Sequence, residues 1–227
     1  MTSGLRRFRA AAAPLPAPAP VPVDGPAPVA EQRCDMCAVE VSPAEHSHVV
    51  NTETRAIMCT CRGCYLLFTH RGAGGGKHRA VPERYVHAAK LALGDAMWES
   101  AGIPVGMAFF FTNSELNKTV AFYPSPAGAT ESLLPLGAWE ELLADNPGLA
   151  DVEPDVEALL VNKTDSGFEC FLVPIDACYE LVGLIRLKWR GFDGGTEAKE
   201  EIATFFAGLR ERATPVTEPQ DGGRANG

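Results

Sequence analysis

The chain has 227 residues, of which 46% are hydrophobic, so it can bury a core and form one domain or a small module joined to a larger one. Its net charge of −9 is unevenly spread: residues 33–90 carry a net charge of +3 and all five histidines, whereas residues 91–227 carry −13. An acidic surface of this kind repels nucleic acid and anionic membranes, so neither is an expected partner. The sequence has no apolar run of about 18 residues, and we predict no membrane span.

The seven cysteines are an odd number, and five of them lie within residues 34–64. A secreted disulfide framework usually has an even number of cysteines behind a signal peptide. Residues 1–30 do not resemble such a peptide, because alternating alanine and proline follow the first arginines and cannot form an apolar helix. We therefore expect a disordered tail over residues 1–30 and a reducing, cytoplasmic setting in which the thiols are available to a metal.

Two CxxC pairs, Cys34 with Cys37 and Cys61 with Cys64, give the clearest functional signal. A CxxC turn presents two sulfurs to one ion, and two such turns complete a tetrahedral shell without water. This pattern predicts a structural Zn²⁺ site, with iron as a less favoured occupant of the same thiols. Cys59 is expected to be a buried strand residue rather than an alternative ligand.

Residues 31–82 are predicted to form the metal module. Between the two pairs, HVVN and RAIMCT flank a TET turn and indicate a hairpin, and the second pair begins a helix expected to end at Gly72. This order is typical of a treble clef, and a zinc ribbon with the second pair on a β-turn is the alternative. The GAGGG segment is followed by Lys-His rather than the Lys-Ser/Thr of a phosphate loop, so residues 71–82 are expected to be a Gly-rich connector and hinge.

Two groups of residues suggest catalysis less strongly. His46 and His48 alternate on the first strand of the hairpin and are expected to face solvent or to support the metal site. A catalytic histidine between two CxxC pairs is also found in treble-clef nucleases of the HNH type, which leaves a nuclease as an alternative. Cys170 and Cys178 are expected to be buried free cysteines, and Cys178 would need a histidine base to act as a nucleophile.

Residues 83–212 are predicted to form an α+β domain. Residues 83–101 indicate helix broken near Gly94, residues 105–112 and 118–124 indicate a hairpin, and the following PSPAGATES segment indicates a loop. An amphipathic helix is predicted over residues 136–146, and the acidic run over residues 151–157 is expected to be solvated.

The second half of this domain begins with another predicted hairpin, residues 156–161 and 168–173, around an Asp-Ser-Gly turn. A short helix over residues 176–182 is expected to begin at an Asp176 cap and to end at Gly183, and residues 184–190 alternate like a strand. Thr196 is expected to cap a last helix that buries Ile202, Phe205, Phe206 and Leu209. The expected architecture is an antiparallel sheet with helices packed against it, followed by a disordered tail over residues 213–227.

Several strings recur in order in a known group of proteins: CDMCAVE, CRGCYLLFTHRGAGGGKHRAVPERY, IPVGMAFFFTNSEL, VAFYPSPAGATES, EPDVEALLV, FLVPIDACYELVGLIRLKWRGFDGG and FFAGLR. Over roughly residues 31–212 the chain resembles an uncharacterised family of high-GC bacteria that is encoded in [NiFe]-hydrogenase gene clusters. The resemblance supplies no catalytic residue. It implies an accessory role in maturation or assembly, with a hydrogenase subunit or a maturation factor as the protein partner.

The favoured hypothesis is therefore a non-enzymatic, zinc-binding accessory protein. An iron-binding redox or electron-transfer module at the same four cysteines is one alternative, and an enzyme is the other, either an HNH-like nuclease or a thiol enzyme using Cys178.

Overall fold

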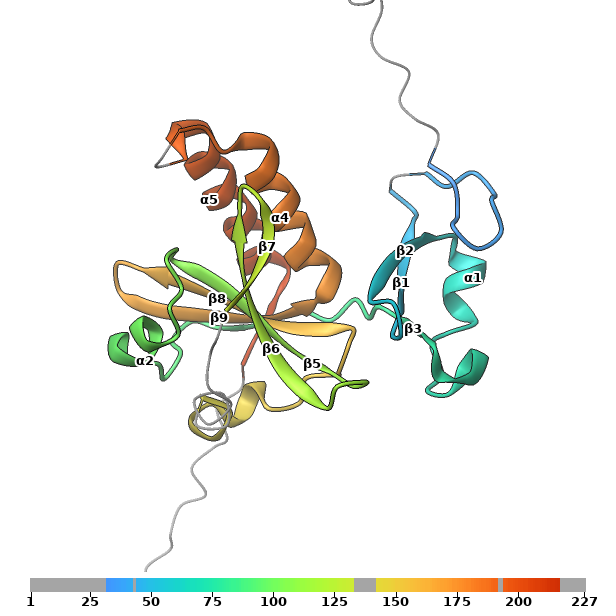
Figure 1. Ribbon diagram of the computed structural model, residues 1–227, viewed down its shortest axis with the longest axis horizontal. Coiled ribbons are helices and arrows are strands. Elements are labelled where there is room, and N and C mark those ends of the chain that lie inside the picture. Colours follow the sequence, from blue (N-terminus) through green and yellow to red (C-terminus); the bar gives the residue numbers. More distant parts are fainter. Residues whose placement is uncertain (1–31, 43, 133–141, 192–193, 217–227) are drawn as a thin grey trace, which may run out of the picture. The chain divides into compact units, whose positions relative to one another are not determined.

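The computed structural model describes residues 32–42, 44–132, 142–191 and 194–216 (Figure 1). The described chain forms a three-stranded sheet, β2-β1-β3, and a seven-stranded sheet, β10-β4-β9-β8-β5-β6-β7. The mixture of helices with mainly antiparallel sheets confirms the expected α+β class. The tail predicted over residues 1–30 lies outside the described residues.

The small sheet contains the predicted hairpin. Strands β1 (Ser47–Asn51) and β2 (Ala56–Thr60) are antiparallel, and a third strand, β3 (His78–Ala80), pairs with the other edge of β1. This third strand lies inside the segment predicted to be a connector. It follows a short 3₁₀ helix, η1 (Ala73–Gly76), in which three consecutive glycines have positive φ and turn the chain back toward β1.

The large sheet is built around two long hairpins, both of which confirm the predicted ones. Each neighbouring pair of strands is antiparallel except β10 with β4. The seven strands are β4 (Val86–Ala88), β5 (Met107–Asn113), β6 (Lys118–Ser125), β7 (Gly128–Ser132), β8 (Glu157–Thr164), β9 (Gly167–Pro174) and β10 (Thr214–Pro215).

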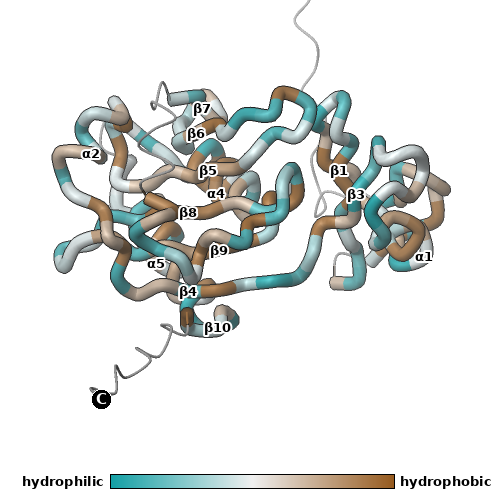
Figure 2. The backbone as a smooth tube through the Cα atoms, turned by 90° about the horizontal axis from the view of Figure 1, so that it is seen from below, coloured by the Kyte–Doolittle hydropathy of each residue, from teal (hydrophilic) through white to brown (hydrophobic). Residues whose placement is uncertain are grey.

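Both faces of the large sheet are covered, because successive side chains of a strand point to opposite faces. Phe109, Leu160 and Phe171 lie on the face covered by helices α4 (Ile175–Lys188) and α5 (Gly195–Arg212). The neighbouring residues of the same strands lie on the other face, with Trp98 of α2 (Asp95–Ser100) and Leu149 of the 3₁₀ helix η2 (Pro147–Leu149). Figure 2 shows hydrophobic residues along the central strands β8 and β9.

Two predictions in the first half of the domain were wrong. Residues 83–90 are not helical and instead contain β4, which pairs with β9. The segment predicted to be a loop contains the end of β6 and all of β7, joined by a turn at which Gly128 has a φ of 126°. In both cases a neighbouring strand supplies hydrogen bonds that local sequence pattern does not reveal.

The predicted short helix and following strand are in fact one helix, α4. Cys178, Leu181, Val182 and Ile185 are buried at helical spacing, so the apolar face continues past Gly183. Pro174 rather than Asp176 occupies the N-cap position, without a side-chain cap hydrogen bond, and Asp176 lies in the first turn of the helix. Helix α5 begins after Gly194 and buries Phe205, Phe206 and Leu209 as predicted, with Ile202 partly buried.

Three further predictions concern the ends of elements. Of the helix predicted over residues 136–146, residues 142–145 are helical and the rest lies outside the described residues. Strand β10 lies in the segment predicted to be a disordered tail, and residues 217–227 are outside the described chain. The division into a metal module and an α+β domain at residue 82 stays a prediction.

The prediction of a solvated face over residues 151–157 is right for Asp151, which is exposed, but wrong for Asp155 and Glu157, which are buried. Glu157 is 1% exposed and accepts two hydrogen bonds from Arg84, at 2.8 and 2.7 Å. Arg79 of β3 donates to Glu153 and lies 3.7 Å from Asp155. These arginines hold the chain on either side of Val81 against the segment that leads into β8.

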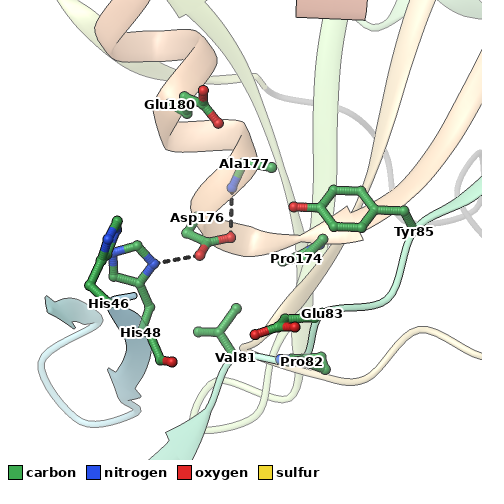
Figure 3. A pocket seen from close by; sticks show the side chains of 11 residues that line it. His46, His48, Val81, Pro82, Glu83, Tyr85, Pro174, Asp176, Ala177 and Glu180 are labelled. Carbon is green, nitrogen blue, oxygen red and sulfur yellow. Dashed lines mark hydrogen bonds and ion pairs between the residues drawn. The ribbon is translucent and has the colours of Figure 1, made fainter. Parts of the chain in front are cut away.

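A second polar link joins the small sheet to α4. His48 Nδ1 lies 2.5 Å from Asp176 Oδ2 (Figure 3). Val50 of β1 and Val81 belong to the apolar cluster on the α4 side of the large sheet. The small sheet therefore shares a core with the rest of the described chain.

Candidate metal centre

The first CxxC pair lies on a tight turn. The backbone N–H of Cys34 donates to Val39 O at 2.9 Å, and the N–H of Ala38 donates to Cys34 O at 2.8 Å. Ala38 has a φ of 61°, a left-handed conformation that turns the chain sharply after Cys37. The turn therefore holds both thiols of the pair on one short loop.

The second pair lies at the start of helix α1 (Arg62–Leu66), not on a β-turn. Cys61 is the N-cap, and its Sγ accepts a hydrogen bond from Cys64 N at 3.4 Å. The helix is shorter than predicted, since it ends at Leu66 instead of Gly72. The carbonyl of Phe68 accepts a hydrogen bond from Ala80 N of β3, which a continued helix would not allow.

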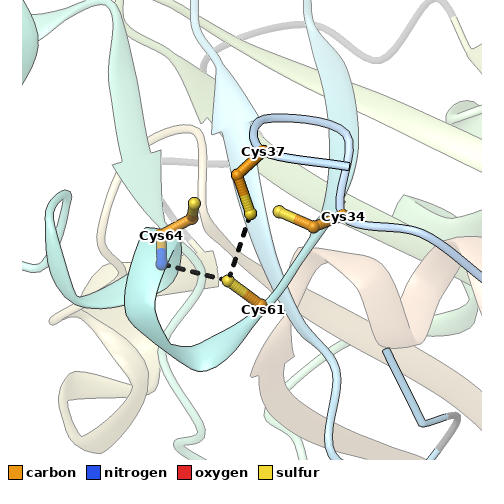
Figure 4. A group of neighbouring side chains, drawn as sticks. All are labelled: Cys34, Cys37, Cys61 and Cys64. Atoms are coloured by element: carbon orange, nitrogen blue, oxygen red, sulfur yellow. Dashed lines mark hydrogen bonds between the residues drawn. The ribbon is translucent and has the colours of Figure 1, made fainter. Parts of the chain in front are cut away.

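The two pairs bring four thiols together. The Sγ atoms of Cys34, Cys37, Cys61 and Cys64 all lie within 4.8 Å of one another (Figure 4). Cys37 Sγ and Cys61 Sγ are 3.7 Å apart. A tetrahedral zinc site with bonds of about 2.3 Å has sulfur–sulfur edges of about 3.8 Å. Among the described residues, these four side chains have their donor atoms close enough together to hold a metal ion.

The electrostatics of the cluster favour a cation. Burial raises the pKa of the Cys34 thiol, but hydrogen bonds from the backbone N–H groups of Cys61, Cys37 and Met36 outweigh it and lower the pKa to about 6. Burial, together with hydrogen bonds to the other thiols, raises the pKa of Cys64 to about 12. The Cys34 thiolate thus forms readily, while the Cys64 thiol stays protonated. A bound metal cation would lower the pKa of Cys64 and allow it to ionise.

Cys59 does not join the cluster. It lies in β2, where it is half-buried rather than fully buried as predicted. Its backbone N–H donates to Asp35 Oδ2 at 2.7 Å, and its carbonyl accepts from Asp35 N at 2.8 Å. The Asp35 bonds attach the first CxxC turn to the hairpin, a contribution that the cysteine pattern alone did not reveal.

Neither histidine belongs to the cluster of four thiols. His48 is in β1 and is half-buried against Asp176, while His46 precedes the strand with its ring 4.8 Å from that of His48. Asp176 follows His48 by 128 residues, and no local pattern in the sequence links the two.

The remaining cysteines are buried as predicted. Cys170 in β9 and Cys178 in α4 are both 0% exposed. Burial raises the pKa of each thiol well above its usual range. A protonated thiol closed off from solvent is poorly suited to nucleophilic attack, so the structure gives the thiol-enzyme hypothesis no support.

Comparisons with known proteins identify one family and no curated or solved relative. No curated protein and no solved structure matches the chain significantly. No helix of the described segments is both long enough and apolar enough to cross a membrane. One family model matches residues 33–213, which include all four clustered cysteines and both sheets up to β10. The chain therefore belongs to the family of unknown function DUF5947.

Proposed function

We propose that this protein is a non-enzymatic, zinc-binding accessory protein that supports the maturation or assembly of a [NiFe]-hydrogenase. The observation that carries the proposal is the gathering of four cysteine thiols from two CxxC turns within 4.8 Å of one another.

The donor set supports zinc in a structural role. Four thiolates complete a tetrahedral shell and leave no open position for water or substrate. The order of a CxxC turn, the β1–β2 hairpin, and a helix that begins at the second pair supports a treble-clef-like module. A module of this size gains its folding free energy largely from the metal.

The accessory role rests on the family resemblance and on the surface of the module. The strings that resemble proteins from hydrogenase gene clusters include both CxxC pairs and recur in order from Cys34 to Arg210. Leu66 and Leu67, at the end of α1, are 54% and 65% exposed. Exposed leucines beside a rigid metal site offer contacts to a protein partner.

Iron at the same four thiols is the second candidate function, since a tetrahedral sulfur site also suits iron. The HNH-like alternative is less favoured. Such an enzyme needs a metal-binding residue later on the helix. Helix α1 ends at Leu66, so His70, the candidate for that position, is exposed beyond the helix.

Metal analysis of tag-free protein, purified without added metal, tests the first part of the proposal. We expect one zinc per chain, loss of zinc in Cys61→Ser, and retention in the matched control Cys59→Ser. Iron, seen with a visible thiolate-to-iron absorption band, would contradict the zinc assignment and favour the electron-transfer alternative.

The partner is tested separately in the native host. A tagged wild-type chain should enrich hydrogenase subunits or maturation proteins relative to the Cys61→Ser variant. Recovery of neither group of proteins would contradict the accessory role even if zinc is present. Equal recovery with both variants would contradict a role of the metal site in binding the partner.

A further inference from the structure

A second polar site lies between the small sheet and the start of α4. A pocket of about 350 Å³ is bordered by His46 and His48 on one side and by Asp176 and Glu180 of α4 on the other. Glu83 and Tyr85 line it as well. None of the four clustered cysteines belongs to this pocket, so it is a separate candidate site.

The two histidines meet at the edge of the pocket. His48 lies in β1, and His46 lies directly before this strand. Their ring centroids are 4.8 Å apart, with an angle of 77° between the rings. Two imidazoles this close can donate to one ion.

Asp176 and Glu180 lie one turn apart on the same side of α4. Figure 3 shows Asp176 facing His48, with Glu180 further along the helix. Glu180 is exposed, so its carboxylate can change rotamer without losing packing. The pocket therefore combines imidazoles from one element with carboxylates from another.

The contact between His48 and Asp176 resembles the support of a metal-binding histidine. His48 Nδ1 lies 2.5 Å from Asp176 Oδ2, which leaves Nε2 as the ring nitrogen for a ligand. Histidines that bind metals usually have the other ring nitrogen hydrogen-bonded to a carboxylate or carbonyl, which fixes the ring and raises its basicity.

We propose that this pocket binds a second divalent cation of the borderline class, such as Ni²⁺, Co²⁺ or Zn²⁺. His46 and His48 supply imidazole nitrogens, Glu180 supplies a carboxylate oxygen, and Asp176 positions His48. Imidazole with carboxylate favours these ions over Mg²⁺ or Ca²⁺, which prefer oxygen ligands alone.

Binding requires a local adjustment, because among the described residues the donor atoms already gathered are those of the four cysteines. The His46 ring and the Glu180 side chain must turn toward His48 Nε2. The three carboxylates bordering the pocket, including the exposed Glu83, favour a cation there. The proposal uses no cysteine ligand and does not depend on the hydrogenase assignment.

Nickel titration of the zinc-loaded, tag-free full chain tests this site. After equilibrium dialysis with NiCl₂, elemental analysis should find one nickel per chain with the zinc content unchanged. His48→Ala should abolish nickel retention, and Asp176→Asn should weaken it by about 10- to 100-fold, the usual effect of removing a carboxylate that supports a ligand.

Glu180→Gln and His70→Ala complete the test. Glu180 is exposed, so its substitution should preserve the fold while weakening nickel binding at least about tenfold. His70 is exposed elsewhere in the small module, and His70→Ala should bind nickel like the wild type. The proposal is overturned if the wild type retains no nickel, if nickel enters only as zinc leaves, or if folded His48→Ala or Glu180→Gln binds like the wild type.

Discussion

The two sheets of this protein are stabilised in different ways. The seven-stranded sheet buries phenylalanine, leucine and valine side chains on both faces, in two large clusters. The small sheet has few buried apolar residues, of which Val50, together with Val81 directly after β3, belongs to the core under α4. Its other end is held by the thiols of two CxxC turns. One sheet is thus stabilised by burial. We propose that the other depends on a metal ion at the four thiols together with contacts to its neighbour.

This difference follows from the amount of apolar surface that each sheet can remove from water. Strand β8 is buried along most of its length, whereas β2 has one buried residue, Thr60. At about 25 cal/mol per Å² of buried apolar area, a short hairpin of that kind gains too little to offset the loss of chain entropy. Metal removal and core substitutions should therefore affect the two sheets unequally.

The largest expected effect comes from removing a thiol ligand. Cys61→Ser should lose the metal and, with it, a contribution of the size seen in small zinc domains, about 10 kcal/mol of apparent binding free energy. In hydrogen-exchange mass spectrometry, the amides of β1 and β2 should lose protection while those of β8 and β9 keep theirs.

Cys59→Ser is the matched control, because Cys59 lies in β2, two residues before Cys61, and outside the cluster. It should keep both the metal and the protection of β1. If complete metal removal left β1 and β2 as protected as before, the small sheet would not depend on the metal.

A substitution in the core of the large sheet should have the next largest effect. It should destabilise the large sheet and leave the metal site intact. Leu160 in β8 is 0% exposed, so Leu160→Ala should lower the free energy of unfolding by about 2–5 kcal/mol. Metal content should be unchanged in the folded variant. Leu187→Ala is the control, since Leu187 is 71% exposed and should give a change within about 0.5 kcal/mol. Denaturant titration measures the free energy of unfolding, and metal analysis measures the zinc content. Loss of zinc from folded Leu160→Ala would contradict the idea that the two sheets are stabilised separately.

The features predicted correctly from the sequence are those specified by local patterns. The hairpins β1–β2, β5–β6 and β8–β9 each combine β-branched or aromatic runs with a polar turn. The clustering of the four cysteines follows from CxxC spacing. The apolar face of α5 also appears as a helical repeat.

The features that were missed depend on contacts between distant residues. Strands β3 and β4 have three residues each and form because β1 and β9 offer partners. Glu157 appeared to be one of a set of solvated acids, and its burial requires Arg84, 73 residues away in the sequence. The Asp176 partner of His48 was hidden for the same reason.

The ion pair between Arg84 and Glu157 links the two regions and should contribute less than a core leucine. Arg84→Met leaves the buried Glu157 carboxylate without its main partner. Breaking a fully buried pair costs about 3–5 kcal/mol, and the 40% exposure of Arg84 reduces our expectation to roughly 2 kcal/mol.

Adding Glu157→Gln should restore part of that loss, because it removes the unpaired charge. Lys188→Ala removes an exposed ion pair with Glu197 and should leave the thermal midpoint unchanged. Equal losses in Arg84→Met and Lys188→Ala would show that burial of Glu157 adds nothing to the pair.

The smallest expected effect is the pH dependence of Glu169, which lies within the large sheet. Burial raises the pKa of this carboxyl, but hydrogen bonds from Arg210, Asn162 and His87 outweigh burial and hold the pKa below its usual value of 4.5. Because the folded pKa is lowered, the ionised carboxylate stabilises the fold above about pH 4.5, and this contribution is lost as the pH falls through the folded pKa.

Glu169→Gln isolates this contribution, since all other carboxylates titrate alike in both proteins. The wild type should be more stable than Glu169→Gln at pH 7, and the difference in the free energy of unfolding should shrink as the pH falls below about 4.5. Urea titrations of both proteins at several pH values measure it. A difference that stays constant down to pH values where Glu169 is protonated would mean that the variant is destabilised by packing, and that the hydrogen bonds to Glu169 do not favour its charged form.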